Sequence, residues 1–155
     1  MSELSFSRFN GPEIAPVLAQ LHTQSFETTW SVLEFERLLA LDGMKAYVIS
    51  EFENPVGFSL YQIMGDEAEI ITIGISKDHQ KRGLGHLLLN EGLAYLKTKG
   101  VQRLFLEVSE ENMSARNLYE RNSFSKVGVR KKYYQVGSRK IDALVMEKKL
   151  NLEVR

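Results

Sequence analysis

The chain has no cysteine, which excludes disulfides, thiolate metal sites and a cysteine nucleophile. Only three of its 155 residues are proline, and they are isolated, so no proline-rich linker divides the chain. No apolar run approaches the roughly 20 residues of a membrane span, and the N-terminal segment lacks the apolar stretch of a secretion signal. These absences predict one cytoplasmic domain, residues 1–155, that does not associate with membranes.

An excess of one charge is also absent, because Lys+Arg and Asp+Glu both number 20 and the formal net charge is zero. This balance argues against a protein that coats nucleic acid, although it leaves room for a local basic patch. The three histidines, His22, His79 and His86, lack the spacing and the neighbouring carboxylates of a metal site. We therefore expect neither a nucleic-acid partner nor a metal. The sequence carries no signal for the oligomeric state.

Apolar periodicity predicts a mixed α/β fold. Strand-like runs cover 4–9, 45–52, 56–64, 67–76 and 103–108, and two long strands flank a turn at Gly137 within 124–150. Helical periodicity covers 13–26, 30–43, 83–99 and 112–122. This order predicts a central mixed, mostly antiparallel sheet with flanking helices and one right-handed, parallel strand–helix–strand crossover at 70–108. The continuous apolar run at 103–108 is typical of a strand buried on both faces.

Three local signals refine this prediction. Ser31 with Glu34 three residues later is typical of a helix capping box, and Gly100 is expected to end the helix 83–99. Gly74 interrupts a β-rich run, which indicates a bulge or the close approach of a ligand.

The stretch between the strand 67–76 and the helix 83–99 combines flexibility with positive charge. Gly83 and Gly85 permit a sharp bend or close backbone approach, and Lys81 and Arg82 precede a helix N-terminus, which favours phosphate. The P-loop pattern and the third glycine of the dinucleotide fingerprint are both missing. By spacing alone, a phosphate-binding loop and an ordinary solvated loop both remain open.

The sequence of this loop, "QKRGLG" at 80–85, resembles the Q/R-x-x-G-x-G/A motif of the GCN5-related N-acetyltransferases. Downstream, "LEVSEENMSARNLYERNSF" at 106–124 is similar to the signature of the RimI-like protein N-terminal acetyltransferases, and "VRKKYY" and "WSVLEF" extend the likeness. Two departures are Ser123, where the family usually has glycine, and Ser76-Lys77, where it commonly has Asp-Pro. The departures bear most on the choice of substrate.

The resemblance implies an acetyl-CoA-dependent transfer to the N-terminal amine of a protein, the family acceptor being an N-terminal alanine of a ribosomal protein. It implies that Glu107 is the general base, directly or through water, and that Tyr119 protonates the leaving thiolate. The cofactor-binding residues implied by the family pattern are Ile73, Gly74, Ile75, Gln80, Lys81, Arg82, Gly83, Leu84, Gly85, His86 and Asn112. Trp30, Tyr133 and Tyr134 are the candidates for lining the acceptor groove.

Each of these residues also has a purely structural interpretation. Glu107 could be a strand-end carboxylate facing water, Tyr119 a core tyrosine, and Asn112 a helix N-cap. Two alternative functions also remain open: acetylation of a small-molecule amine or a lysine, and a non-catalytic acyl-CoA-binding module. The presence of both Glu107 and Tyr119 argues against the second alternative.

Overall fold

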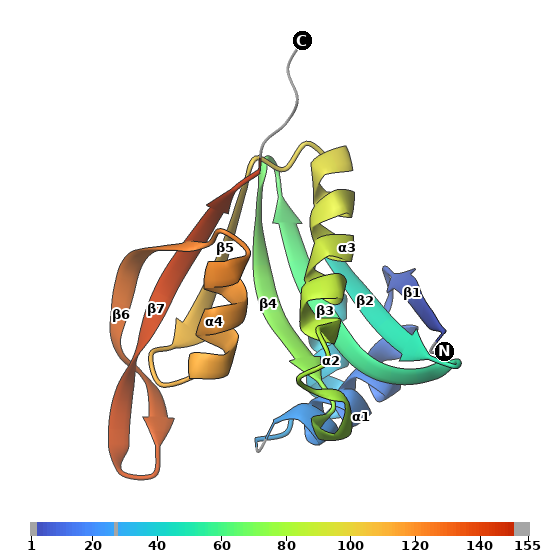
Figure 1. The fold of residues 1–155 in the computed structure, drawn as a ribbon, viewed down its shortest axis with the longest axis horizontal. Coiled ribbons are helices and arrows are strands. Elements are labelled where there is room, and N and C mark those ends of the chain that lie inside the picture. Colours follow the sequence, from blue (N-terminus) through green and yellow to red (C-terminus); the bar gives the residue numbers. More distant parts are fainter. Residues whose placement is uncertain (1–2, 27, 151–155) are drawn as a thin grey trace.

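The computed structural model describes residues 3–26 and 28–150 and contains one seven-stranded sheet in the order β1-β2-β3-β4-β5-β7-β6 (Figure 1). The strands are β1 (Leu4–Phe9), β2 (Met44–Glu51), β3 (Asn54–Met64), β4 (Glu67–Ile75), β5 (Arg103–Ser109), β6 (Ser125–Val136) and β7 (Arg139–Lys149). β4 and β5 pair in parallel, and every other neighbouring pair is antiparallel. The predicted mostly antiparallel sheet with one parallel crossover is confirmed.

Helices cover both faces of this sheet (Figure 1). They are α1 (Ala15–Ser25), α2 (Val32–Leu39), α3 (Leu84–Thr98) and α4 (Met113–Arg121), with short 3-10 turns η1 (Pro12–Ile14) and η2 (Lys77–His79). Strand alternation divides the core: Tyr47 packs with α3, whereas its neighbour Val48 packs with α1 and α2. Among the described residues, no helix is long and apolar enough to cross a membrane.

The predicted helix signals are present. Ser31 Oγ accepts from the Glu34 backbone N–H, and the Glu34 carboxylate accepts from the Ser31 N–H, which completes the capping box at the start of α2. Gly100 has a φ of +79° and follows Lys99, the C-cap of α3. Asn112 caps α4, because its Oδ1 accepts from the N–H of Ala115 at 3.1 Å.

β4 and β5 pair over only part of their length. Glu67–Ile70 pair with Arg103–Leu106, and beyond this point the two strands separate (Figure 1). β4 departs at a bulge, since Tyr61 and Leu60 of β3 face Ile70 and Thr72 and leave Ile71 as the extra residue. The separation opens a gap at the carboxyl ends of both strands.

Two strand predictions need correction. The bulge that Gly74 suggested lies instead at Ile71, because Gly74 pairs regularly with Phe58. The close approach at Gly74 is made by the chain itself, since a Cβ there would lie 2.9 Å from Phe26 and from Ser25. β5 is fully buried on one face only, because the side chains between its buried leucines and valine are half-buried.

Replacing Gly92 by alanine is expected to destabilise the fold by about 1–3 kcal/mol, despite the better helix propensity of alanine. A Cβ at Gly92 of α3 would lie 2.3 Å from the hydroxyl of Tyr61, which is 1% exposed and has no room to retreat. Urea unfolding measures the change, with the exposed neighbour Glu91→Ala as control and an expected change within about 0.5 kcal/mol. A Gly92→Ala protein as stable as the parent would contradict this packing.

Candidate active site

A cleft of about 540 Å³ lies beside the carboxyl end of β4. The cleft is bounded by the end of β4, the loop 79–83, the first turn of α3, and α4, with the end of α1 at its rim. Most of the predicted cofactor-binding and catalytic residues line it: Ile73, Gly74, Ile75, Gln80, Lys81, Gly83, Leu84, Gly85, His86, Asn112 and Tyr119. Residues far apart in the sequence thus meet around one cavity.

The loop presents backbone donors at the mouth of this cleft. Gly83 is the N-cap of α3 with a φ of +79°, and Lys81 also has a positive φ of 64°. The first intrahelical bond runs from the N–H of Leu87 to the carbonyl of Gly83, which leaves the preceding N–H groups of the first turn for an external acceptor. These donors and the positive end of the α3 dipole favour a phosphate group.

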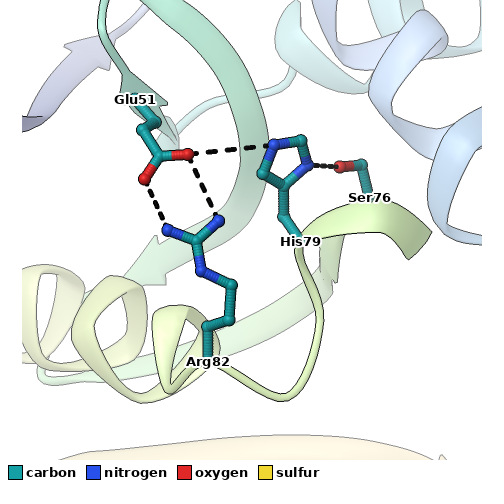
Figure 2. A network of polar contacts seen from close by, with 4 residues as sticks. All are labelled: Glu51, Ser76, His79 and Arg82. Atoms are coloured by element: carbon teal, nitrogen blue, oxygen red, sulfur yellow. Dashed lines mark hydrogen bonds and ion pairs between the residues drawn. The ribbon is translucent and has the colours of Figure 1, made fainter. Parts of the chain in front are cut away.

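Arg82 is the predicted loop residue that lies outside the cleft lining. Its guanidinium instead binds the carboxylate of Glu51 at the end of β2, with Nη1 3.2 Å from Oε1 and Nη2 donating to Oε2 (Figure 2). Both arms of the side chain are thus engaged by Glu51, and contact between Arg82 and the cofactor stays a prediction. The structural partner, Glu51, carried no signal in the sequence.

Tyr119 lies in the cleft and in the core at once. It is 5% exposed, and its ring packs edge-on against Phe124 with a centroid distance of 5.5 Å. Burial raises the pKa of its phenol above the ordinary value of 10, so the hydroxyl keeps its proton at neutral pH. The cleft-lining and core interpretations of Tyr119 hold together, since packing fixes the position of the hydroxyl.

Glu107 belongs to the other face of the sheet. Its neighbours on β5, Leu106 and Val108, point into the core beneath α3 and α4, so its side chain projects to the side of α1 and α2. Arg130 of β6 donates from Nη1 to both carboxylate oxygens, at 3.1 and 2.9 Å. Glu107 and Tyr119 therefore lie on opposite faces of the sheet.

A second carboxylate accompanies Glu107. Glu69 of β4 is half-buried, and burial followed by the charge of Glu107 raises the pKa of its carboxyl. Neither Glu69 nor Arg130 was singled out in the sequence, although Arg130 stands in the "VRKKYY" run that carries the resemblance. To predict that Glu69 lies near Glu107, one would have to know the register of the parallel strands β4 and β5.

The three predicted acceptor-side aromatics fall into two groups. Tyr133 and Tyr134 lie on β6 near Glu107: their ring centroids are 5.2 Å apart, and the Arg130 guanidinium lies 4.0 Å from the Tyr133 centroid. Burial, and then the charge of Glu107, raises the pKa of Tyr134. Trp30 is stacked on His22, with a centroid distance of 4.8 Å, on the side of the sheet that α1 and α2 cover.

The histidines serve packing and loop contacts. His22 is buried among the rings of Phe26, Trp30, Phe35 and Phe58, and burial lowers its pKa, so its ring is neutral at physiological pH. His79 bonds to Ser76 at 2.7 Å, and His86 to Asn90 at 3.0 Å. Within residues 3–26 and 28–150, no three His, Asp or Glu side chains are grouped so as to hold a metal ion.

Comparison with known proteins defines the class. The sequence profile of the acetyltransferase (GNAT) family matches residues 15–124. The chain is 40% identical to the ribosomal protein bS18-alanine N-acetyltransferase of Haemophilus influenzae over 119 residues, which is 76% of this chain and 79% of that protein. It is 32% identical to the enzyme of the same name from Salmonella typhimurium over 136 residues, 84% and 88% of the two chains.

The fold agrees. The crystal structure of the ribosomal-protein-S18-alanine N-acetyltransferase from Escherichia coli superposes with a TM-score of 0.89 at 24% identity, covering 98% of this chain and 97% of that one. The chain belongs to the GNAT acetyltransferase family. It is an N-acetyltransferase, and its co-substrate is acetyl-CoA.

Proposed function

We propose that this N-acetyltransferase acetylates the α-amine of the N-terminal alanine of a ribosomal protein, and that one domain, residues 1–155, carries the activity. The observation that supports this acceptor is the 40% identity, over 79% of its length, to the Haemophilus influenzae enzyme named for the alanine of ribosomal protein bS18. A ribosomal acceptor is consistent with the cytoplasmic location predicted from the sequence.

In the proposed reaction, the two substrates approach from opposite sides of the sheet. The thioester enters from the cleft that Tyr119 lines, and the amine approaches from the face of Glu107, so the two reactants meet in the gap between β4 and β5. An α-amine has a reference pKa of about 7.7–8.0, so a carboxylate, acting directly or through water, is a sufficient base near neutral pH. A lysine amine near 10.4 would be harder to deprotonate.

In the proposed mechanism, Glu107 accepts the proton that the α-amine loses as its nitrogen attacks the thioester carbon. A backbone N–H of β4 stabilises the developing oxyanion. The C–N bond forms, the C–S bond breaks, and Tyr119 donates its phenolic proton to the departing sulfur. The buried phenol is protonated at neutral pH, so its proton is available as negative charge develops on the sulfur.

Rates with a matched set of acceptors test the assignment. The set is an alanine-first bS18 peptide, the same peptide with a blocked N-terminus and a free lysine, and a polyamine. We expect kcat/KM to be at least about 100-fold higher for the free alanine peptide, as the lower amine pKa and the peptide contacts both favour it. Equal rates with the blocked peptide or the polyamine would favour the lysine or small-amine alternative. Coenzyme A binding without turnover on any acceptor would favour a non-catalytic module.

A further inference from the structure

The loop that lines the cofactor cleft is tied to a distant hairpin by one carboxylate (Figure 2). Glu51, the last residue of β2, receives both arms of Arg82, and the His79 ring lies with Nε2 3.9 Å from the same carboxylate. The opposite nitrogen of His79 bonds to Ser76 Oγ at 2.7 Å. The two ends of the loop, at His79 and at Arg82, thus converge on Glu51.

One side of this contact is shielded from water, because the Glu51 side chain is 14% exposed whereas that of Arg82 is 42% exposed. The Arg82 guanidinium keeps the pKa of Glu51 below its usual range. A partly buried, two-armed arginine–carboxylate pair fixes direction as well as distance, which an exposed ion pair does not. Arg82 is therefore held with its side chain directed toward β2.

The backbone around Arg82 needs such a restraint. Lys81 and Gly83, the residues on either side of it, both have left-handed φ values, 64° and 79°. A lysine in this region is unfavourable by about 1 kcal/mol or more, so the surrounding contacts must hold the conformation. The same two residues line the cleft, where the loop leads into the free N–H groups of α3. The loop conformation that suits a phosphate thus depends on where Arg82 is held.

We infer that Glu51 is a positioning residue for acetyl-CoA binding: by holding Arg82, it fixes the loop 80–85 in the phosphate-binding conformation before the ligand arrives. The inference rests on acetyl-CoA binding at this loop and is independent of the acceptor. It also gives Arg82 a role different from the direct phosphate contact that the sequence motif suggests. Pre-organisation of this kind raises affinity because the ordering cost is met in the free protein.

The test is the dissociation constant of coenzyme A, measured by calorimetry on the full chain with no acceptor present. Glu51→Gln and Arg82→Ala are each expected to weaken binding by roughly five- to tenfold. The double variant is expected to be no weaker than either single one, because both remove the same contact. Glu53→Gln, a carboxylate on the same hairpin outside this network, is expected to bind coenzyme A as the parent does.

Steady-state kinetics separate positioning from general damage. The KM for acetyl-CoA should rise with the dissociation constant, while kcat at saturating acetyl-CoA stays within about twofold. A charge swap, Glu51→Arg with Arg82→Glu, should recover part of the lost affinity. If Arg82 bound phosphate directly, Arg82→Ala would weaken binding and Glu51→Gln would not, and the inference would be overturned. Unchanged affinity in Arg82→Ala would overturn it equally, whatever acceptor the enzyme uses.

Discussion

Tyr119→Phe is expected to lower kcat by about 10²- to 10⁴-fold while leaving the KM for acetyl-CoA nearly unchanged. The ring packs against Phe124 and is almost fully buried, so phenylalanine keeps the packing and removes only the acidic proton. Without it, the thiolate must leave unprotonated or take a proton from water, and this loss is confined to the transition state.

Single-turnover kinetics with the alanine-first peptide measure this effect, since they report the transfer step without product release. Thermal unfolding of the variant serves as the control for packing, and the change in stability should stay within about 1 kcal/mol. A Tyr119→Phe enzyme with the parental transfer rate would show that another group protonates the sulfur.

The second large effect is expected for Glu107→Gln, which should lower kcat/KM for the peptide by about 10²- to 10⁴-fold near pH 7. Glutamine keeps the shape of the side chain but cannot accept the amine proton. A neutral amine still loses one proton as the amide forms, so the defect should persist above the pKa of the α-amine, about 8. Glu110→Gln, on the exposed turn after β5, is the matched control and should behave as the parent does.

Arg130 offers an independent check on the role of Glu107. Its guanidinium donates to both oxygens and so fixes the direction of the carboxylate. Arg130→Gln removes these contacts, so kcat/KM for the peptide is expected to fall by about tenfold while the KM for acetyl-CoA stays unchanged. A parental kcat/KM in Arg130→Gln would argue that the reaction does not depend on how the Glu107 carboxylate is held.

The features predictable from the sequence are those with a local cause. The capping box at Ser31, the turn at Gly100 and the glycine loop before α3 each depend on residues within a few positions of one another. Strand alternation and the order of the helices and strands can also be recognised from neighbouring residues, and they predicted the sheet and its crossover. The family motif then indicated which loop and which strand belong to the site.

The features that were missed depend on contacts between distant segments. The Arg82 side chain is directed to Glu51, which lies 31 positions earlier in the chain. Glu107 pairs with Arg130, which lies 23 positions later. The bulge at Ile71 arises from the register between β3 and β4, whereas the sequence suggested a bulge at Gly74. Propensity and periodicity carry no information about such registers.

The most direct test of the proposed reaction is the location of the acetyl group on full-length ribosomal protein bS18 after incubation with this enzyme and acetyl-CoA. Tandem mass spectrometry of the product distinguishes the α-nitrogen of the first residue from every lysine side chain. The proposed site predicts one acetyl group on the α-nitrogen of an N-terminal alanine, and its loss with Glu107→Gln. Acetylation of lysine side chains with a free N-terminus would contradict the proposal.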